Sequence, residues 1–381
     1  MRIYQLGEIE NRETFLKKLK VHKKGIYIMS NKMELLFFYI KGLKTPAINI
    51  LKQDALSVGA EVASPAGVIL CEKDRYDCLL FGTRKHIEIL SYKELMQPFG
   101  LKEVAKELQK FLKEKREFPT QIMGIINANS DSFYNKSRFR GEEAISQIEK
   151  LIADGADIID IGGVSSRPNS IGISVEEELE RVKPICDTIR EKKLYEKVIF
   201  SIDSYTPKVI EYALNSGFSI INDIKGARDD EVIKLAVKYG AKLCIMHMQG
   251  EPKNMQDNPT YENVILDISD FFQERIERCR ELGLSLENTI LDIGIGFGKS
   301  LEHNLELIKN LIHFKKFGTQ ILIGASRKSL IDKISPSKVE DRLSGTLAIH
   351  LKALDNGADI IRCHDVKEHK QAISIWKALK N

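Results

Sequence analysis

Residues 198–224 read VIFSIDSYTPKVIEYALNSGFSIINDI, and this stretch sets the pattern for most of the chain. Two runs rich in Ile and Val, at 198–203 and 219–224, flank an amphipathic segment that closes near Gly217. Glycine is common where a helix ends, so the stretch reads as a strand, a helix and a second strand. Parallel strands need such a crossover, and the stretch therefore predicts one βαβ unit of a parallel sheet.

The same alternation continues on both sides of this stretch, from Gln121 to the C-terminus. Six further runs resemble strands: QIMGIIN (121–127), ADIIDIGG (156–163), KLCIMHM (242–248), TILDIG (289–294), QILIGAS (320–326) and ADIIRCHD (358–365). Eight units over about 260 residues suit a (β/α)8 TIM barrel, an α/β fold for which roughly 250 residues is typical. An open doubly wound sheet is the alternative, since local patterns do not show whether a sheet closes.

Polar residues stand near the C-terminal end of every one of these runs. They are Asn127, Asp160, Asp203, Asn222, His247, Asp292, the turn Ser326-Arg327-Lys328, and Arg362 with His364. Active sites of barrels lie at the C-terminal ends of the strands. Buried polar groups need partners, so the set predicts a site for a polar ligand. The simpler interpretation, that each residue caps a nearby loop, accounts for any one of them but poorly for all.

The first part of the chain lacks this regularity. Possible strands at 25–30, 35–40, 66–72 and 78–83 are followed by a helix-like segment at 100–118. We therefore expect a small α/β domain at 1–115, followed by the barrel domain at 120–381. The sequence does not indicate what the N-terminal domain does.

Composition limits the classes of partner. The net charge of +4 over 381 residues is too small to indicate nucleic-acid binding. The six cysteines show no CxxC spacing, which is typical of a reducing, cytoplasmic protein. The apolar stretch 33–40 is too short to span a bilayer, and the N-terminus lacks the apolar core of a signal peptide. We expect a cytoplasmic protein with no membrane partner.

The stretch 291–300, LDIGIGFGKS, resembles a phosphate-binding loop but departs from it. Ile293 stands where the P-loop pattern requires its first glycine, and the glycine spacing does not fit the dinucleotide fingerprint either. Asp292 remains, at a strand end and before glycines that permit close approach of a ligand. A carboxylate there can accept paired N–H groups from the edge of a heterocycle.

Taken in order, these motifs resemble those of the dihydropteroate synthases over residues of about 120–381. The resemblance rests on Asn127 with Asp131-Ser132-Phe133, GADIIDIGGVSSRP, SIDSY, IINDI, MHMQGEPKNMQ, LDIGIGFGKS, GASRKS, RLSGTLA and RCHD. It implies a (β/α)8 barrel that joins p-aminobenzoate to 6-hydroxymethyl-7,8-dihydropterin pyrophosphate. The products are 7,8-dihydropteroate, a folate precursor, and pyrophosphate. A homodimer is expected by resemblance only.

The resemblance also implies roles for individual residues. Pterin binding falls to Asp203, Asn222, Asp292 and Lys328, with Asp160 at the same depth. Pyrophosphate binding falls to Asn127, Ser166, Arg167, Arg362 and His364, with Asn127 also holding Mg²⁺. The p-aminobenzoate slot is formed by Phe133, Ser166, Pro168, Phe297 and Ser329. Asn127, Lys328, Arg362 and His364 form the catalytic group. Lys299 is expected on the solvated surface, and His247 is left out of the site because a core role is equally compatible with its neighbours.

The chain departs from the family pattern in two loops. The first loop has Asn129-Ser130 where Thr-Pro is usual and lacks the Asp-Gly-Gly that usually follows, and the second has Val164, Ser166 and Asn169 for Glu, Thr and Gly. The hydroxyl of Ser166 is kept, so we expect sulfonamides, which compete for the p-aminobenzoate slot, to inhibit the enzyme. Two alternatives are a catalytically silent pterin-binding homologue and a pterin-dependent methyltransferase. A pterin pyrophosphokinase domain in the first 115 residues is not expected, because no acidic metal-binding cluster is present there.

Overall fold

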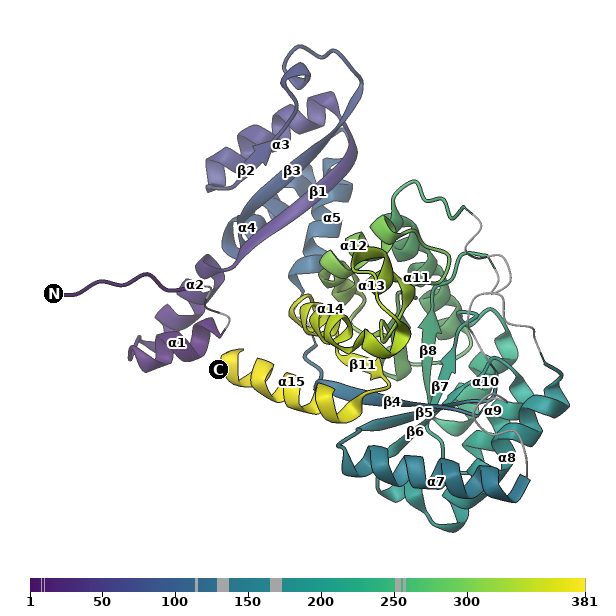
Figure 1. Ribbon diagram of the computed structural model, residues 1–381. Coiled ribbons are helices and arrows are strands. Elements are labelled where there is room, and N and C mark those ends of the chain that lie inside the picture. The colour runs from purple at the N-terminus through teal and green to yellow at the C-terminus, as the bar shows by residue number, and fades with distance from the viewer. Residues whose placement is uncertain are drawn as a thin grey trace. The chain divides into compact units, whose positions relative to one another are not determined.

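The stretch at 198–224 forms strand β6 (Ile199–Asp203), helix α9 (Pro207–Leu214) and strand β7 (Ile220–Asp223) in the computed structural model (Figure 1). The structure describes residues 1–7, 9, 11–113, 116–128, 137–164, 173–250, 255 and 258–380, with the backbone alone at 137–142. The chain divides into two units. Unit 1 is Met1–Lys115 with Lys377–Asn381, and unit 2 is Arg116–Trp376.

Unit 2 is a closed barrel of parallel strands, in the order β10-β11-β4-β5-β6-β7-β8-β9. The other strands are β4 (Gln121–Asn127), β5 (Ile158–Gly162), β8 (Lys242–Met246), β9 (Thr289–Asp292), β10 (Gln320–Ile323) and β11 (Ile360–Cys363). Strands β9, β10 and β11 join the series back to β4, with Leu322 paired to Asp292 and to Ile360. The predicted barrel is therefore confirmed, and the open doubly wound sheet is excluded.

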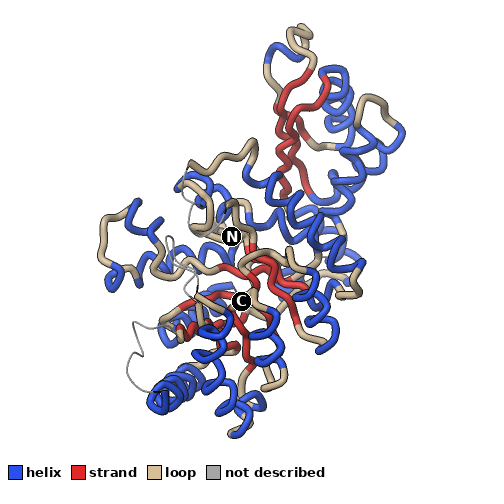
Figure 2. The backbone as a smooth tube through the Cα atoms, turned by 90° about the vertical axis from the view of Figure 1, so that its right-hand side faces the viewer, coloured by secondary structure: helices blue, strands red, loops and turns tan. Residues whose placement is uncertain are grey.

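Helices surround the barrel and cover its outer face (Figures 1 and 2). Besides α9 they are α7 (Ser137–Ala153), α8 (Val175–Glu191), α10 (Asp230–Tyr239), α11 (Val264–Glu281), α12 (Leu301–Lys309), α13 (Ser329–Ile334), α14 (Leu343–Asp355) and α15 (Val366–Lys380). Short 3-10 turns are η3 (Leu194–Glu196), η4 (Leu286–Asn288), η5 (Leu311–Phe317) and η6 (Val339–Asp341). Outward-facing strand residues such as Ile159, Ile221 and Leu291 are fully buried against these helices.

The inside of the barrel has its own apolar layer. Met123, Ile158, Ile220, Cys244, Ile290, Leu322 and Ile360 form a separate buried cluster, one from each of seven strands, and β6 contributes the buried Ser201 at the corresponding depth. Side chains alternate between the two faces of a strand. Residues two positions further along each strand therefore face the interior as well, nearer to the C-terminal mouth.

Unit 1 is built on an antiparallel sheet in the order β1-β3-β2. Its strands are β1 (Leu35–Lys44), β2 (Glu61–Ala63) and β3 (Arg75–Thr83). Its helices are α1 (Arg12–Lys18), α2 (Lys23–Met33), α3 (Thr45–Val58), α4 (Arg84–Lys93) and α5 (Leu101–Leu112), with 3-10 turns η1 (Ala66–Val68) and η2 (Glu94–Met96). Residues of α3, α4 and α5 pack on one face of the sheet around Leu80.

Two of the four strands expected in unit 1 are confirmed and two are wrong. The segments 35–40 and 78–83 lie in β1 and β3. The segment 25–30 lies in helix α2. Ile26 is its only buried residue, so the segment lacks the row of buried side chains that a strand would pack against a sheet partner. The segment 66–72 begins with the 3-10 turn η1, because Pro65 lacks an N–H for a sheet ladder and Gly67 favours a turn.

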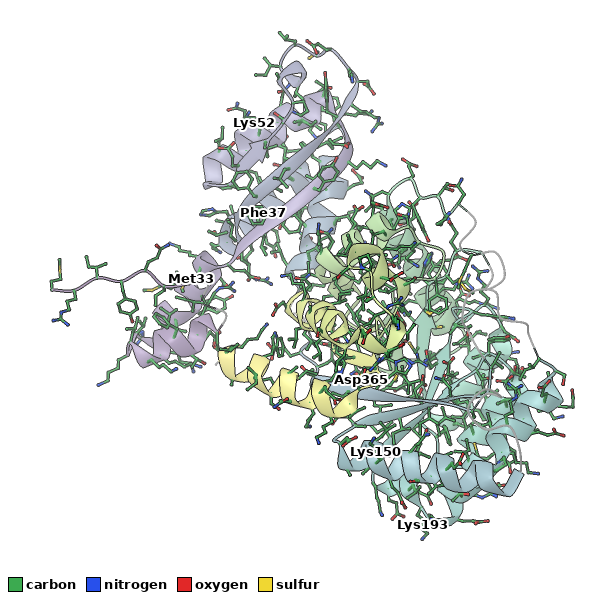
Figure 3. The ribbon with its side chains drawn as sticks, in the orientation of Figure 1. Met33, Phe37, Lys52, Lys150, Lys193 and Asp365 are labelled. Carbon is green, nitrogen blue, oxygen red and sulfur yellow. The ribbon has the colours of Figure 1, made fainter. Side chains whose placement is uncertain are left out.

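The other face of this sheet carries exposed aromatic side chains. Phe37, labelled in Figure 3, is 60% exposed and Tyr39 is 64% exposed, and Phe37 stacks on Phe81 of β3. Figure 2 shows helices along one side of these strands. No helix in the described part of the chain combines the length and apolar composition that a membrane crossing needs.

Candidate active site

A ring of polar residues replaces the apolar layer of the barrel two positions nearer to its mouth. The inward-facing residues at this depth are Ile125, Asp160, Asp203, Asn222, Met246, Asp292 and Arg362, from β4, β5, β6, β7, β8, β9 and β11. The sequence places these residues by strand period alone, since each stands two positions after a member of the buried layer. Only Ile125 and Met246 are apolar. The layer below closes the barrel, so the ring forms the floor of a site that opens at the C-terminal mouth.

Arg362 connects two of the carboxylates across the floor. Its Nε donates to Asp160 Oδ2 at 2.7 Å, and its Nη2 donates to Asp203 Oδ2 at 2.8 Å. Asn222 Nδ2 donates to the same Asp160 oxygen at 3.0 Å. The other oxygen of Asp160 is buried and has no hydrogen-bond partner among the described residues. The floor is thus a connected network of side chains from four strands, β5, β6, β7 and β11, with one acceptor left over.

Burial and mutual repulsion shift the ionisation of this network. Desolvation raises the pKa of Asp203 to about 7, against the lowering effect of Arg362, while Asp160 and Glu178 raise it further. Burial by itself would lower the pKa of the Arg362 guanidinium, but Asp160 and Asp203 outweigh it and raise that pKa above its ordinary value. Arg362 therefore stays charged, and Asp203 titrates close to neutral pH.

Asp292 and Lys328 carry opposite charges near the mouth, and each affects the ionisation of the other. Asp292 is buried, and its Oδ1 accepts a hydrogen bond from Gly294 N at 2.8 Å. Burial raises the pKa of Asp292, while the positive charge of Lys328 and the Gly294 N–H oppose this. Burial lowers the pKa of Lys328 to about 8, against the raising effect of Asp292. Lys328 Nζ donates to Ile295 O at 2.5 Å.

The turn before α13 positions Lys328, whose charge acts on Asp292. Arg327 has a φ of 55°, in the left-handed region that non-glycine residues rarely adopt. Its guanidinium makes a bidentate pair with Asp365, at 2.7 and 3.0 Å, and donates to the carbonyl oxygens of Val339 and Glu340. Figure 3 labels Asp365 where α15 begins. These bonds stabilise the strained turn.

An apolar wall faces the polar floor. Ile224, Met246, Met248 and Met255 form a buried cluster against which Tyr205 and Phe297 pack. Lys328 Nζ lies 4.5 Å from the centre of the Phe297 ring. A flat ring bound here would have apolar side chains beside it and carboxylate, amide and ammonium groups at its edge, which is typical of small-molecule sites.

The remaining residues of the expected site lie at the rim or outside the described residues. Asn127 is half-buried at the end of β4. His364 is exposed after β11, and its Nδ1 lies 2.9 Å from Ser326 Oγ. Ser329 is exposed in the first turn of α13. Phe133, Ser166, Arg167 and Pro168 lie outside the described residues.

The expectation that Lys299 lies on the solvated surface is wrong. Its side chain is fully enclosed, with Nζ 3.0 Å from His247 Nδ1. His247 is buried as well, and burial lowers its pKa to about 2. Lysine is rarely buried, and no pattern in the sequence signals this contact between two loops. Met246 was also missed, although the strand period from Cys244 would have identified it.

Comparisons with known proteins identify relatives of unit 2. The family of pterin-binding enzymes matches residues 123–364. A dihydropteroate synthase from Escherichia coli (strain K12) is 40% identical over 258 residues, which cover 68% of this chain and 90% of that protein. A second relative matches almost the whole chain. The bifunctional dihydropteroate synthase/dihydropteroate reductase from Helicobacter pylori is 42% identical over 361 residues, 95% of this chain and 92% of that protein.

Solved structures agree with these relatives. The dihydropteroate synthase of Yersinia pestis in complex with a sulfonamide drug has a TM-score of 0.64 and 38% identity, and the match covers 69% of this chain and 94% of that chain. The dihydropteroate synthase of Clostridium difficile, crystallised in the presence of pteroic acid, has a TM-score of 0.64 and 37% identity, over 69% and 98% of the two chains.

Proposed function

The chain belongs to the dihydropteroate synthase family of pterin-binding enzymes, and we propose that its barrel condenses p-aminobenzoate with 6-hydroxymethyl-7,8-dihydropterin pyrophosphate. The observation that carries this proposal is the polar ring in the barrel, where Asp203, Asn222 and Asp292 lie at one depth beside the wall around Met246. A pterin is flat and has alternating donors and acceptors at its edge. The ring and the wall match both properties.

The proposed roles follow from charge and depth. Asp292 accepts paired N–H groups from the amino-pyrimidine edge of the pterin, since its carboxylate is acceptor-only when ionised. Asp203, Asn222 and Lys328 contact the rest of that ring, and Asp160 orients Asn222 and Arg362. Phe297 and Ser329 border the p-aminobenzoate slot, together with Phe133, Ser166 and Pro168. Arg362 and His364, with Asn127, Ser166 and Arg167, receive the pyrophosphate.

The reaction then needs little acid–base chemistry from the protein. The arylamine nitrogen of p-aminobenzoate attacks the methylene carbon, the carbon–oxygen bond to pyrophosphate breaks, and the amine loses a proton. The leaving anion must be stabilised, and Arg362 remains charged because two carboxylates raise its pKa. A guanidinium has five N–H donors, and the bonds to Asp160 and Asp203 use two of them. Water must be excluded, because it competes with the amine.

Mg²⁺ fits this site as an ion that is bound together with pyrophosphate. The described residues contain no group of three or more His, Cys, Asp or Glu that would hold a metal ion by themselves. Mg²⁺ commonly takes one or two protein ligands and the oxygens of a phosphate. Asn127 would supply the protein oxygen, and the ion would neutralise charge on the leaving group. The family resemblance also supports a homodimer, which we propose here. A cytoplasmic location is proposed as well, and the six cysteines, all free thiols, are compatible with that reducing compartment.

Release of pyrophosphate tests the proposed reaction. We expect release only when both substrates are present, and a loss of at least 100-fold in kcat/KM in Asp292→Ala and Arg362→Ala. Asp229→Ala is the control, because Asp229 caps α10 through Glu231 N and stands outside the site. A sulfonamide should compete with p-aminobenzoate. Binding of the pterin without pyrophosphate release would indicate the silent homologue, and methyl transfer from methyltetrahydrofolate would indicate the methyltransferase.

A second candidate activity is the reduction of dihydropteroate. The observation that favours it is the extent of the match to the bifunctional Helicobacter pylori protein, which takes in most of unit 1. The match to the Escherichia coli synthase is about as long as unit 2 alone. Unit 1 is therefore the part of the chain that would add the second activity. In that reaction a hydride donor reduces the remaining C=N bond of the dihydropterin ring, and a proton is taken up.

The reductase proposal is tested on the full chain. Dihydropteroate is supplied with reduced nicotinamide or reduced flavin as hydride donor, and the formation of tetrahydropteroate is followed by mass spectrometry. The Escherichia coli synthase, assayed in parallel, is the control and should give synthase activity alone. Absence of the reduced product with every donor would overturn the second activity and leave the synthase proposal intact.

A further inference from the structure

Lys299 places an ammonium group inside unit 2, close to the proposed site. Its side chain is 2% exposed. Nζ donates to His247 O at 3.2 Å and to Phe297 O at 2.9 Å, and it lies 3.0 Å from His247 Nδ1. An ammonium has three N–H donors, so these three acceptors satisfy it completely. Burial lowers the pKa of His247 to about 2, so its ring is neutral and can accept the third hydrogen bond.

The lysine joins two loops that leave neighbouring strands. We refer to residues 247–249, after β8, as the β8 loop and to residues 293–300, after β9, as the β9 loop. The loops approach so closely that a Cβ on Gly294 would lie 2.0 Å from His247 O, and one on Gly298 would lie 2.4 Å from Gln249 O. Tyr261 Oη also donates to Gly298 O at 2.7 Å. The contact is therefore built over the whole length of the β9 loop.

This contact holds the residues that face the substrates. Phe297, whose carbonyl Lys299 binds, packs its ring against the wall around Met246, and Lys328 lies over that ring. Asp292 is the last residue of β9 and the origin of the β9 loop. The β9 loop thus links the proposed pterin ligand to the proposed p-aminobenzoate slot. The hydrogen bonds of Lys299 hold this loop against the β8 loop.

The charge of Lys299 also acts on Asp292. The charged groups that act on Asp292 are Lys328, Arg362 and Lys299, and all three lower its pKa against the effect of burial. The groups that act on Lys299 are Asp292 and Lys328. Burial lowers the pKa of Lys299 itself to about 7, while Asp292 raises it. Lys299 is thus one of three cations that keep Asp292 ionised.

We propose that Lys299 is a positioning residue for the synthase reaction, because its ammonium group fixes the β9 loop against the β8 loop and its charge supports the ionised form of Asp292. The inference rests on the proposed role of Asp292 in pterin binding. It extends that role to a residue that contacts neither substrate. Two measurable properties should depend on Lys299: the geometry of the p-aminobenzoate slot and the pH at which the pterin site becomes protonated.

The test variant is Lys299→Met, which keeps the length of the side chain and removes its charge and donors. We expect the KM for p-aminobenzoate to rise about tenfold, because Phe297 loses its anchor. The acid limb of kcat/KM for the pterin pyrophosphate should move upward by roughly one pH unit, since a nearby cation that favours the carboxylate is lost. In Lys299→Arg the charge is kept, and the acid limb should stay at its parental pH.

Lys315→Met is the matched control for loss of a buried ammonium. Lys315 pairs with Asp359 at 2.8 Å near the N-terminal ends of β10 and β11, at the opposite end of the barrel from Lys299. The Lys315→Met substitution should lower the thermal stability of the enzyme and leave the KM and the pH profile of the folded enzyme unchanged. Folded fractions are measured by circular dichroism, so a variant that folds poorly is still comparable.

Four outcomes are separable. An upward shift of the acid limb in Lys299→Met, absent from Lys299→Arg and Lys315→Met, supports the inference. A folded Lys299→Met with parental KM and parental pH profile overturns it, as does an equal change in Lys299→Met and Lys315→Met. Asp292→Asn is measured alongside. If that variant binds the pterin as the parent does, the proposed site itself fails, and the failure is not one of Lys299.

Discussion

At the scale of single residues, the floor of the barrel is a balance of buried charges. Asp160 and Asp203 share one cation, Arg362, and Asp292 relies on Lys328 and Lys299. Removing one partner from such a pair leaves an uncompensated buried charge, which typically costs about 3–5 kcal/mol. Activity and stability are therefore coupled at these positions, and each site variant requires a measurement of folding beside its kinetics.

The ionisation of Asp203 predicts a pH dependence. Desolvation raises the pKa of Asp203 to about 7, so the carboxylate becomes protonated as the pH falls through neutrality. A protonated carboxyl loses an acceptor for the pterin, and kcat/KM for the pterin pyrophosphate should fall below about pH 7. The acid limb reports every carboxylate that must be ionised to hold the pterin, Asp292 as well as Asp203, so a change in the ionisation of either one moves it. A profile that is flat from pH 8 to well below 6 would contradict this prediction.

A second residue-scale prediction concerns Glu94 in unit 1. Glu94 is fully buried, and neither carboxyl oxygen accepts a hydrogen bond from the described residues, while the Asp54 carboxylate lies close enough to accept one from protonated Glu94. Burial, followed by the charge of Asp54, raises the pKa of Glu94 to about 7 from its ordinary 4.5. The folded state therefore binds the proton more tightly than the unfolded state, and stability falls as the pH rises from about 4.5 to 7.

Glu94→Met should remove this loss. We expect the free energy of unfolding of unit 1 to rise by about 2 kcal/mol at pH 8 and to change little at pH 4.5. Urea denaturation at the two pH values, followed by circular dichroism, measures the difference. An equal effect at both pH values would mean that packing, and not ionisation, is responsible.

At the scale of elements, the β9 loop depends on glycine for its approach to the β8 loop. Gly294 has a φ of 65°, and a Cβ there would lie 2.0 Å from His247 O. Gly240, at the end of α10, has a φ of 62° and no heavy atom within 4 Å of such a Cβ. The two glycines share the same backbone strain, and only the first has a steric reason to be glycine.

This pair allows a matched experiment. Gly240→Ala should cost about 1 kcal/mol for the left-handed backbone and leave activity unchanged. Gly294→Ala should cost more, since backbone atoms must move apart, and it should displace Asp292 and reduce kcat/KM for the pterin pyrophosphate. Thermal unfolding and steady-state kinetics of both variants give the comparison. Equal losses in both would refute the steric role of Gly294.

At the scale of the whole molecule, two separate cores divide the chain. Unit 1 has its own apolar cluster around Leu80, and unit 2 has the cluster between the barrel and its helices. Separate cores are typical of domains that unfold as individual units. Trp376 is the only tryptophan of the chain, and its Nε1 donates to Asp355 Oδ1 at 2.7 Å within unit 2. Its fluorescence should therefore report the unfolding of unit 2.

Ligands of the synthase site should stabilise unit 2 selectively. A ligand at about 100 times its dissociation constant adds about 2.7 kcal/mol to the stability of the domain that binds it. The pterin pyrophosphate should raise the midpoint of the Trp376 transition and leave the calorimetric transition of unit 1 in place. A single transition that shifts as a whole would show that the two units unfold together.

The sequence by itself determined the eight strand–helix units of unit 2 and the identity of their polar residues, and only the resemblance to a family favoured a closed barrel over an open sheet. Strand period and glycine placement are local properties, and they located all eight strands of unit 2 to within a few residues. The motifs from Asn127 to His364 identified the family. In unit 1 the runs at 25–30 and 66–72 misled the strand assignment, because local hydrophobicity does not show whether a neighbouring strand is present.

Only the tertiary structure decided which charges meet. The Arg362–Asp160 pair spans 202 residues of sequence, and the Lys299–His247 contact spans 52. Nothing local in the sequence specifies such contacts, because they depend on the closure of the barrel and on how closely two loops approach. Closure brings β11 next to β4 and places Arg362 between two carboxylates. Burial then sets the ionisation of those carboxylates, which the amino-acid types alone leave open.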